Sequence, residues 1–487
     1  MTICDKIMLT MKNRKGNVYL PFDEMFMDCV EQDQELSRKE FCDGIAQLVQ
    51  DGQLEQEEDR LYIPKVRAYE DTVAGILAEL LSENRLPHTD IPEVLAFDDV
   101  VLTEEQREAV SLALDYRLSI IQGGAGTGKS TLIQAIVQQY DRAEGPVLLC
   151  APTGKAACNL RERTGFRGNT IHGAFESAFR DGLILPYGLV IVDEAGMVSL
   201  EMLAWILSTL RPSCRVVLVG DPNQLPPVDC GRVMEDLLEL GVPHILLTTC
   251  HRQADTEGAL SYNVCNFDRC FGMGDLSFDA SFMFFPQKDE RQMAQYLCKA
   301  AASLYQEGQN VQVLSPYGSR GILSAAALNG RLQGLVNPRE GEKMYPLHDG
   351  DRVMVIQNDW TQNVCNGETG VLHLLPREGQ EPLYQVTCGD RQAIYNYDKV
   401  LRYLALAYAA TVHKAQGSEY DTVLFPVSKS FAPLLTRNLF YTAISRAKRR
   451  VILVGDSEAL SFALKNFPAQ RYSMLAGKVE QLCLCRV

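Results

Sequence analysis

The chain has 487 residues and a formal net charge of −15, with 46% hydrophobic and 22% charged residues. These values are typical of a folded protein with two to four domains and exclude a disordered or fibrous chain. No apolar run reaches about 18 residues, so we predict no membrane span. Residues 1–19 lack the apolar stretch of a signal peptide. We therefore expect a cytoplasmic protein.

The acidic charge is concentrated near the N-terminus. Residues 1–100 hold 10 Lys and Arg against 22 Asp and Glu, a balance of −12, which leaves the rest of the chain nearly neutral. Because electrostatic binding depends on where basic groups lie, the net charge does not exclude a nucleic-acid partner. The 15 cysteines show no paired metal spacing, and we expect reduced, mostly buried thiols.

The first 95 residues predict a small α+β unit. Phe41, Ile45 and Leu48 recur at helical spacing, and residues 53–64 are typical of a short strand pair that turns in an acidic run. A helix followed by a hairpin suggests a winged-helix-like unit. Because its acidity should repel a duplex backbone, we interpret this unit as a partner-binding or structural module.

Beyond residue 95, short β-branched apolar runs alternate with helical stretches, as in parallel strands covered on both faces. Ligands of such sheets bind beyond the carboxyl ends of the strands. Several runs end there in a polar or glycine-rich cluster, which we expect to face one common site: GGAGTGKST (123–131), APTGKAA (151–157), DEAGM (193–197), GDPNQLPP (220–227) and SPYGSRG (315–321). Residues 344–402 differ and predict short antiparallel strands, hence a small inserted β-barrel.

The first cluster fits the phosphate-loop pattern G-x-x-x-x-G-K-S/T, with a strand before it and an amphipathic helix after it. Backbone amides of such a loop wrap phosphates at a helix N-terminus. Lys129 is expected to neutralise the β and γ oxygens and Ser130 to ligate Mg²⁺. The predicted nucleotide-binding residues are Gly123, Gly124, Ala125, Gly126, Thr127, Gly128, Lys129, Ser130 and Thr131.

Two adjacent carboxylates, Asp193 and Glu194, follow the apolar run at residues 189–192. We expect Asp193 to hold Mg²⁺ together with Ser130, and Glu194 to orient and deprotonate the attacking water. Both motifs together predict an NTPase that uses ATP and Mg²⁺.

The motifs resemble, in order and spacing, those of superfamily 1 helicases of the RecD-like branch. The matching stretches between residues 95 and 455 include LTEEQREAV (102–110), GGAGTGKST (123–131), APTGKAA (151–157), TIHGAF (170–175), VIVDEAGMVS (190–199), GDPNQLPPV (220–228), HRQ (251–253), VLSPYGSRG (313–321), GDRVMVIQNDW (350–360), NGETGV (366–371), TVHKAQGSEYDTV (411–423) and YTAISRAKRRVILVG (441–455).

This resemblance implies an α/β fold in which two RecA-like P-loop domains with parallel sheets close on ATP. The first domain would span residues 96–243, and the second would span 244–343 and 403–487. An SH3-like β-barrel would be inserted at 344–402, and the winged-helix-like unit would occupy 1–95.

The resemblance also implies roles for residues outside the two nucleotide motifs. Gln106 would read the adenine, although Thr103 and Gln106 also form a capping box by their spacing. Further nucleotide or catalytic residues would be Asp221, Gln224, Arg252, Arg446, Gly417 and Glu419, with both arginines acting as fingers from the second domain. Strand contacts would come from Thr153, Lys155, His172, Thr411, His413 and Lys414.

Several side chains keep two interpretations. Phe175, Tyr317 and Trp360 could stack on bases or belong to a core. The basic run Lys448–Arg450 could contact DNA or form a solvated face.

The predicted function is an ATP-dependent DNA helicase that moves along single-stranded or forked DNA. Its 5′ to 3′ polarity follows from the resemblance alone. Residues 176–189 are short where RecD-like helicases carry a strand-separating β-hairpin. A DNA-stimulated translocase that does not unwind is therefore one alternative. A nucleotide-switch adaptor acting through the N-terminal unit is another, and RNA stays open as the substrate.

Overall fold

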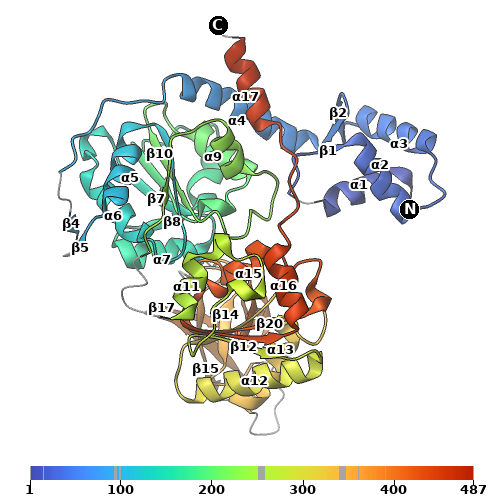
Figure 1. Ribbon diagram of the computed structural model, residues 1–487, viewed down its shortest axis with the longest axis vertical. Helices are drawn as coiled ribbons and strands as arrows, with labels where there is room; N and C mark the ends of the chain where they lie inside the picture. The colour runs from blue at the N-terminus through green and yellow to red at the C-terminus, as the bar shows by residue number, and fades with distance from the viewer. Residues whose placement is uncertain are drawn as a thin grey trace.

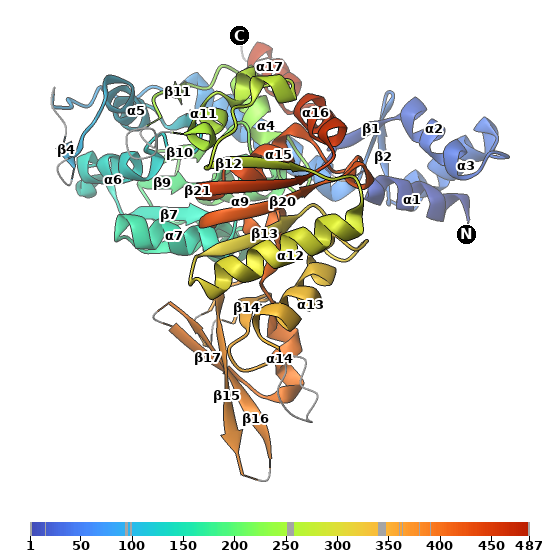
Figure 2. The same cartoon turned by 60° about the horizontal axis from the view of Figure 1, so that its bottom comes forward.

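The computed structural model describes residues 2–14, 16–92, 96–97, 100–250, 258–338, 347–359, 361–362, 364–378, 380–389 and 391–485. Two parallel sheets form two lobes. An N-terminal unit lies beside the first lobe (Figure 1), and an antiparallel sheet projects from the second lobe (Figure 2). Within the described residues, every helix is too short or too polar to cross a membrane.

The first lobe is built on a six-stranded parallel sheet in the order β11-β6-β10-β9-β7-β8. Its strands are β6 (Leu118–Gly123), β7 (Val147–Ala151), β8 (Gly168–Thr170), β9 (Leu189–Val192), β10 (Arg215–Gly220) and β11 (His244–Leu247). A two-stranded pair, β4 (Ala96–Phe97) and β5 (Val100–Val101), precedes this sheet.

Both faces of this sheet are covered, as the continuous apolar runs predict. Alternate residues of a strand point to opposite faces. Ile191 therefore packs with α5 (Glu104–Asp115) and α6 (Lys129–Gln139), whereas Val192 faces α9 (Leu200–Thr209). The remaining helices of the lobe are α7 (Gly154–Thr164), α8 (Ser177–Arg180) and α10 (Val233–Glu239).

The second lobe has a five-stranded parallel sheet in the order β12-β21-β20-β13-β19. Its strands are β12 (Phe282–Pro286), β13 (Val311–Ser315), β19 (Ala409–Thr411), β20 (Tyr420–Val427) and β21 (Ala447–Gly455). Its helices are α11 (Ala259–Cys265), α12 (Glu290–Gln306), α13 (Ala325–Val336), α15 (Arg437–Ile444) and α16 (Ser457–Lys465). The prediction of two α/β units with parallel sheets is confirmed.

The chain crosses between the lobes slightly later than the expected boundary after residue 243. β11 begins at His244 but pairs in parallel with β6, so it forms the edge of the first sheet. The apolar run at residues 244–247 alone does not reveal which of two similar sheets it joins.

The inserted segment forms a five-stranded antiparallel sheet in the order β17-β16-β15-β14-β18 with its own small core. Its elements are β14 (Arg352–Val355), β15 (Thr369–Arg377), β16 (Gln380–Cys388), β17 (Arg391–Tyr395), α14 (Tyr397–Tyr403) and β18 (Leu404–Leu406). β18 pairs with β14 and leads directly into β19 of the second lobe.

The N-terminal unit packs helices against a three-stranded sheet in the order β1-β3-β2. The helix and strand pair expected between residues 36 and 64 are present, and Ser37 and Glu40 form a capping box at the helix start. The elements are α1 (Ile3–Asn13), β1 (Tyr19–Pro21), α2 (Phe22–Gln32), α3 (Arg38–Gln50), β2 (Glu55–Glu57) and β3 (Arg60–Tyr62), followed by α4 (Pro64–Ser82).

The C-terminal segment returns from the second lobe to the first (Figure 1). Residues 466–474, here called the strap, lead from α16 to α17 (Leu475–Leu484), which packs against α4. Arg471 of the strap donates from Nη1 to the carbonyls of Asp229 (3.0 Å) and Gly231 (2.9 Å) in the first lobe. Tyr472 accepts a hydrogen bond from the backbone amide of Val18 at 2.8 Å. The strap therefore ties both lobes to the N-terminal unit.

A buried ion pair anchors the end of the strap. Glu70 of α4 is fully buried, and its Oε1 accepts from the Met474 amide at 2.7 Å. The Lys478 ammonium lies 2.9 Å from Glu70 Oε2 and 2.5 Å from Asp71 Oδ1. Removing the lysine would leave a buried carboxylate without its counter-charge, which is strongly unfavourable.

We expect Lys478→Met to lower the melting temperature by roughly 2–10 °C, because one to a few kcal/mol are lost when a buried charge keeps no partner. Differential scanning fluorimetry measures the shift. Lys429→Met is the matched control, since Lys429 forms an ion pair with Glu458 at an exposed site, and exposed pairs contribute little. Equal melting temperatures for Lys478→Met and the wild type would contradict the anchoring role.

Candidate active site between the two lobes

The loop between β6 and α6 has the backbone geometry of an anion-binding turn. Gly126 and Gly128 have φ angles of +89° and +81°, a left-handed conformation that glycine adopts at little cost. Gly128 caps α6, which therefore begins at Lys129. The unpaired amides and the dipole of a helix N-terminus attract anions. Lys129 is folded onto this loop, and its Nζ donates to the carbonyls of Gly123 (2.6 Å) and Gly124 (2.8 Å).

Asp193 and Glu194 follow β9, which lies in the same sheet as β6. Asp193 Oδ1 accepts from the Glu194 amide at 2.9 Å. Removal from water and the adjacent Glu194 charge raise the pKa of Asp193 to about 6. A bound cation would reverse this shift, since it favours the carboxylate. Glu194 has a φ of +53°, a strained conformation for a residue other than glycine, and such strain is concentrated at functional sites.

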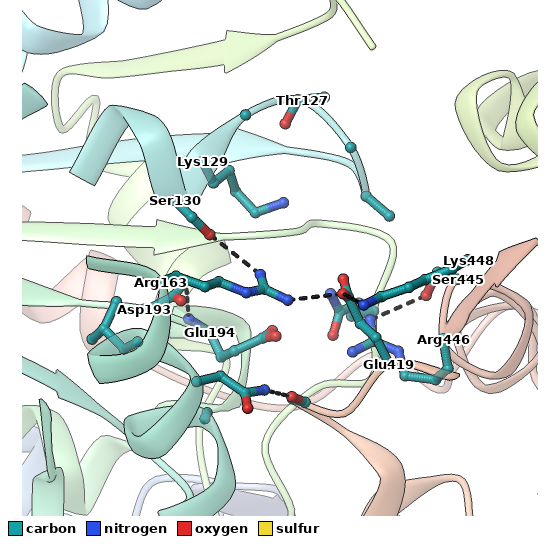
Figure 3. A pocket seen from close by; sticks show the side chains of 18 residues that line it. Thr127, Lys129, Ser130, Arg163, Asp193, Glu194, Glu419, Ser445, Arg446 and Lys448 are labelled. Atoms are coloured by element: carbon teal, nitrogen blue, oxygen red, sulfur yellow. Dashed lines mark hydrogen bonds and ion pairs between the residues drawn. The ribbon is translucent and has the colours of Figure 1, made fainter. Parts of the chain in front are cut away.

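These residues line a cleft of about 480 Å³ between the two lobes (Figure 3). The second lobe contributes Gly417, Glu419, Ser445, Arg446 and Lys448. The first lobe contributes Ala125, Gly126, Thr127, Gly128, Lys129, Ser130, Ala156, Asn159, Leu160, Arg163, Asp193, Glu194 and Gln224.

Gln224 lines this cleft and contacts residues of both lobes. In the amide orientation that satisfies both neighbours, its Nε2 donates to Glu194 Oε2 and its Oε1 accepts from Arg446 Nη2, each at 3.2 Å. Arg446 is nearly buried, and its Nε donates to the Thr442 carbonyl at 3.1 Å. A chain of contacts therefore runs from the carboxylate of the first lobe to the guanidinium of the second.

Helix α15 of the second lobe reaches into the first lobe. The Tyr441 hydroxyl accepts from the amide of Ala125 (3.3 Å) and donates to Asp221 Oδ2 (3.0 Å). Thr442 Oγ1 accepts from the Leu225 amide at 3.0 Å. Burial and the charge of Asp221 raise the pKa of Tyr441, so its hydroxyl stays protonated and can donate to Asp221. A movement of α15 would therefore directly change the contacts of the phosphate loop.

Arg163 is a cleft residue that the sequence analysis did not identify. From α7 it donates to Ser130 Oγ at 3.3 Å and forms an ion pair with Glu419 Oε2 of the second lobe at 2.9 Å (Figure 3). Lys448 lies 3.5 Å from the same carboxylate oxygen. Helical spacing was the available signal, because Ala156, Asn159 and Arg163 recur on one face of the helix that follows APTGKAA.

The other described residues that were predicted to bind nucleotide lie behind or beside the cleft. Gln106 is buried behind the loop, where its Nε2 donates to the Thr127 carbonyl at 3.3 Å and its Oε1 accepts from the Thr103 amide at 3.1 Å, so the predicted capping box is present. Asp221 is buried beside Tyr441. Gly123, Gly124 and Thr131 are outside the cleft lining. Arg252 falls outside the described residues.

Five of the predicted strand-binding residues lie at or just beyond the ends of β7 and β19, and His172 follows β8. After β7, Thr153 caps α7 by accepting from the Ala156 amide at 3.2 Å, and Lys155 follows it. At the end of β19, Thr411 accepts from the Lys414 amide at 3.3 Å. His172, His413 and Lys414 are exposed.

The structure decides the role of one of the three aromatic residues that could stack on bases or belong to a core. Phe175 is fully buried in the first lobe, so it is a core residue and cannot stack on bases. Tyr317 is partly buried and contacts Phe431 at 5.6 Å between ring centres. Trp360 falls outside the described residues.

Sequence profiles of two known domains match the chain. One, described as an AAA domain, matches residues 101–264, and the other, a UvrD-like helicase C-terminal domain, matches residues 406–454. The fold is similar to that of Pif1 helicase from Candida albicans, with a TM-score of 0.50 and 20% identity over 79% of this chain and all of that chain.

Similar proteins extend this match along most of the chain. The ATP-dependent RecD2 DNA helicase of Deinococcus radiodurans is 33% identical to this chain over 440 residues. The matched part covers 87% of this chain but only 59% of that longer protein. The RecBCD enzyme subunit RecD of Mycolicibacterium smegmatis is 31% identical over 84% of this chain and 80% of that protein. This identity over most of both chains shows that the chain belongs to the RecD family of helicases.

Proposed function

We propose that this protein is an ATP-dependent DNA helicase that travels along single-stranded DNA, with 5′ to 3′ polarity as in the family it resembles. The observation that carries the proposal is the bridge across the cleft, in which Gln224 joins Glu194 of the first lobe to Arg446 of the second. Closing the cleft would bring Glu194 and Arg446 together around the nucleotide, and opening it would move them apart. Each cycle of hydrolysis would thus move one lobe relative to the other.

The cleft residues suit ATP and Mg²⁺. Lys129 would leave the loop carbonyls for the β and γ phosphates, and Ser130 with Asp193 would hold the cation, since both supply the oxygen ligands that Mg²⁺ prefers. Glu194 would activate the attacking water. Arg446 would stabilise the charge that develops on the transferred phosphate, and the family resemblance implies the same role for Arg252.

Arg163 would act with these residues as a phosphate contact. It lies between Ser130 and Glu419, so nucleotide and Mg²⁺ would displace it from the serine. A guanidinium released there can bind a phosphate oxygen while Glu419 keeps its second-lobe position. Its pair with Glu419 also brings the two lobes together across the nucleotide.

The accessory units fit the same proposal. The order α1-β1-α2-α3-β2-β3 supports a winged-helix-like unit at residues 1–95, whose acidity suits a protein partner more than a DNA backbone. The five antiparallel strands between residues 352 and 406 support an SH3-like insert. The turn before β15 packs against the loop of Thr153 and Lys155, next to the proposed DNA path.

A translocase that does not separate strands is a second candidate. α8 ends at Arg180 and β9 begins at Leu189, so residues 181–188 form a short connection and not a β-hairpin. Its exposed residues include Leu183 and Ile184. Residues 181–188 therefore occupy the position at which the family carries a strand-separating hairpin.

We expect ATP hydrolysis to be stimulated by single-stranded DNA and to drive unwinding of a fork with a 5′ tail. Glu194→Gln should lower the turnover by roughly 10²–10⁴-fold, because it removes the general base. Lys129→Ala should abolish turnover, whereas Lys299→Ala, on the exposed face of α12, should keep it. Phosphate release and a fluorescent forked duplex measure both activities.

Each outcome discriminates between the candidates. Stimulated hydrolysis without strand release supports the translocase, and equal turnover in the wild type and Glu194→Gln supports the nucleotide-switch adaptor. Stimulation by RNA but not by DNA would reassign the substrate.

We expect Arg163→Ala to raise the KM for ATP about 10-fold, a loss of about 1.4 kcal/mol, because one charged hydrogen bond to phosphate is missing. Steady-state kinetics at saturating DNA measure it. Glu162→Ala is the control, since Glu162 is exposed on the same helix but does not line the cleft. An unchanged KM would show that Arg163 only joins the lobes through Glu419.

We expect Lys414→Ala to weaken binding of a single-stranded oligonucleotide and to flatten its salt dependence. The slope of log affinity against log salt should change by about 0.7, the value for one neutralised phosphate on a single strand. Fluorescence anisotropy across a salt series measures it, with Lys465→Ala on α16 as the exposed control. The same slope in both variants would exclude a phosphate contact by Lys414.

A further inference from the structure

A second cluster of reactive side chains lies apart from the cleft, where the first lobe meets the inserted sheet. Cys158 lies on α7, whereas Cys365 and Glu368 belong to the turn before β15. Each offers one sulfur or oxygen atom, and these three atoms lie within 4.8 Å of one another. Because α7 and this turn belong to different units, the cluster exists only while the two are docked.

The carboxylate of this cluster is buried and incompletely satisfied. Glu368 is 2% exposed. Its Oε1 accepts from the Cys158 thiol at 3.0 Å and lies 2.7 Å from Arg391 Nη1. Its Oε2 has no hydrogen-bond partner among the residues that the structure describes. A buried carboxylate oxygen without a donor is unfavourable, and in proteins such a group is commonly paired or bound to a metal ion.

We propose that Cys158, Cys365 and Glu368 bind one zinc ion, which cross-links α7 of the first lobe to the inserted sheet. Two sulfur ligands select zinc over Mg²⁺, which prefers oxygen alone. Three protein ligands fill three corners of a tetrahedron, and water takes the fourth. Binding releases the two thiol protons, because the thiolate is the ligand.

The charges around the site balance with a divalent cation. Two thiolates and the carboxylate carry −3 together, zinc supplies +2, and Arg391 supplies the remaining +1. The Arg391 guanidinium lies 3.7 Å from the Cys158 sulfur and contacts Glu368, so it neutralises the ligand set from outside without taking a coordination position. Without the cation, both cysteines keep their protons, and the arginine pairs with the carboxylate of Glu368 alone.

The site lies where a cross-link would affect movement. A Cβ atom on Gly154 would come within 2.7 Å of Cys365 Cβ, so the turn docks directly onto the loop that carries Thr153 and Lys155. One residue after Cys158, Asn159 donates to the Gly417 carbonyl of the second lobe. Zinc would therefore hold the insert against α7 at the point where that helix also meets the second lobe.

Zinc binding by the full-length chain tests this proposal directly. The protein is stripped with chelator, exchanged into reducing buffer and titrated with zinc against a chromophoric chelator. We expect about one zinc per chain with submicromolar affinity. Cys158→Ser, Cys365→Ser and Glu368→Gln should each weaken this binding at least about 10-fold. Cys298→Ser, which changes a buried thiol elsewhere in the second lobe, should leave it unchanged.

Two further measurements keep the outcome clear. Cobalt in place of zinc should give thiolate-to-metal absorption bands that Cys365→Ser weakens or loses. Because Cys365 lies in a turn, Cys365→Ser keeps the proposal testable if Cys158→Ser fails to fold. Zinc should also raise the melting temperature of the wild type more than that of Glu368→Gln. The proposal is overturned by equal zinc affinity in all variants, by no binding in reducing buffer, or by a Cys158–Cys365 disulfide with no thiolate-to-cobalt band after its reduction.

Discussion

The chemistry of this chain depends on α15 of the second lobe reaching the phosphate loop of the first. Tyr441 binds the Ala125 amide and the Asp221 carboxylate, and Arg446, two residues after the end of the same helix, contacts Gln224. Because the residues proposed to bind phosphate and those proposed to complete the site belong to different lobes, neither lobe alone holds the whole proposed set. In the proposed function, the relative position of the lobes therefore controls hydrolysis, and hydrolysis in turn sets that position.

The contacts outside the cleft limit how the lobes can move. The strap ties the second lobe to the first through Arg471 and to the N-terminal unit through Tyr472. A second attachment is made by α7, which carries the cleft residue Arg163 and contacts the inserted segment through Cys158. In the proposed cycle, rotation about such attachment points would open or close the cleft without unfolding either sheet. The N-terminal unit and the inserted sheet thus contact segments that link the two lobes.

Local chemistry in the sequence predicted much of this arrangement. A buried strand followed by glycines or carboxylates locates Lys129 and Asp193, because parallel strands end at one edge of the sheet. Arg163 was missed because its role depends on which face of α7 meets the second lobe, and spacing alone does not specify the partner. The sheet joined by β11 and the meeting of Cys158 with Cys365 likewise depend on long-range packing that no local pattern encodes.

The distance between the lobes in different nucleotide states tests the central claim most directly. Spin labels on noncanonical residues at Gln138 of α6 and Gln295 of α12, both exposed, report it by pulsed electron resonance without touching the native thiols. With single-stranded DNA present, a non-hydrolysable ATP analogue should give a shorter mean distance than ADP. Identical distance distributions with the analogue, with ADP and without nucleotide would contradict coupling between the cleft and the lobes.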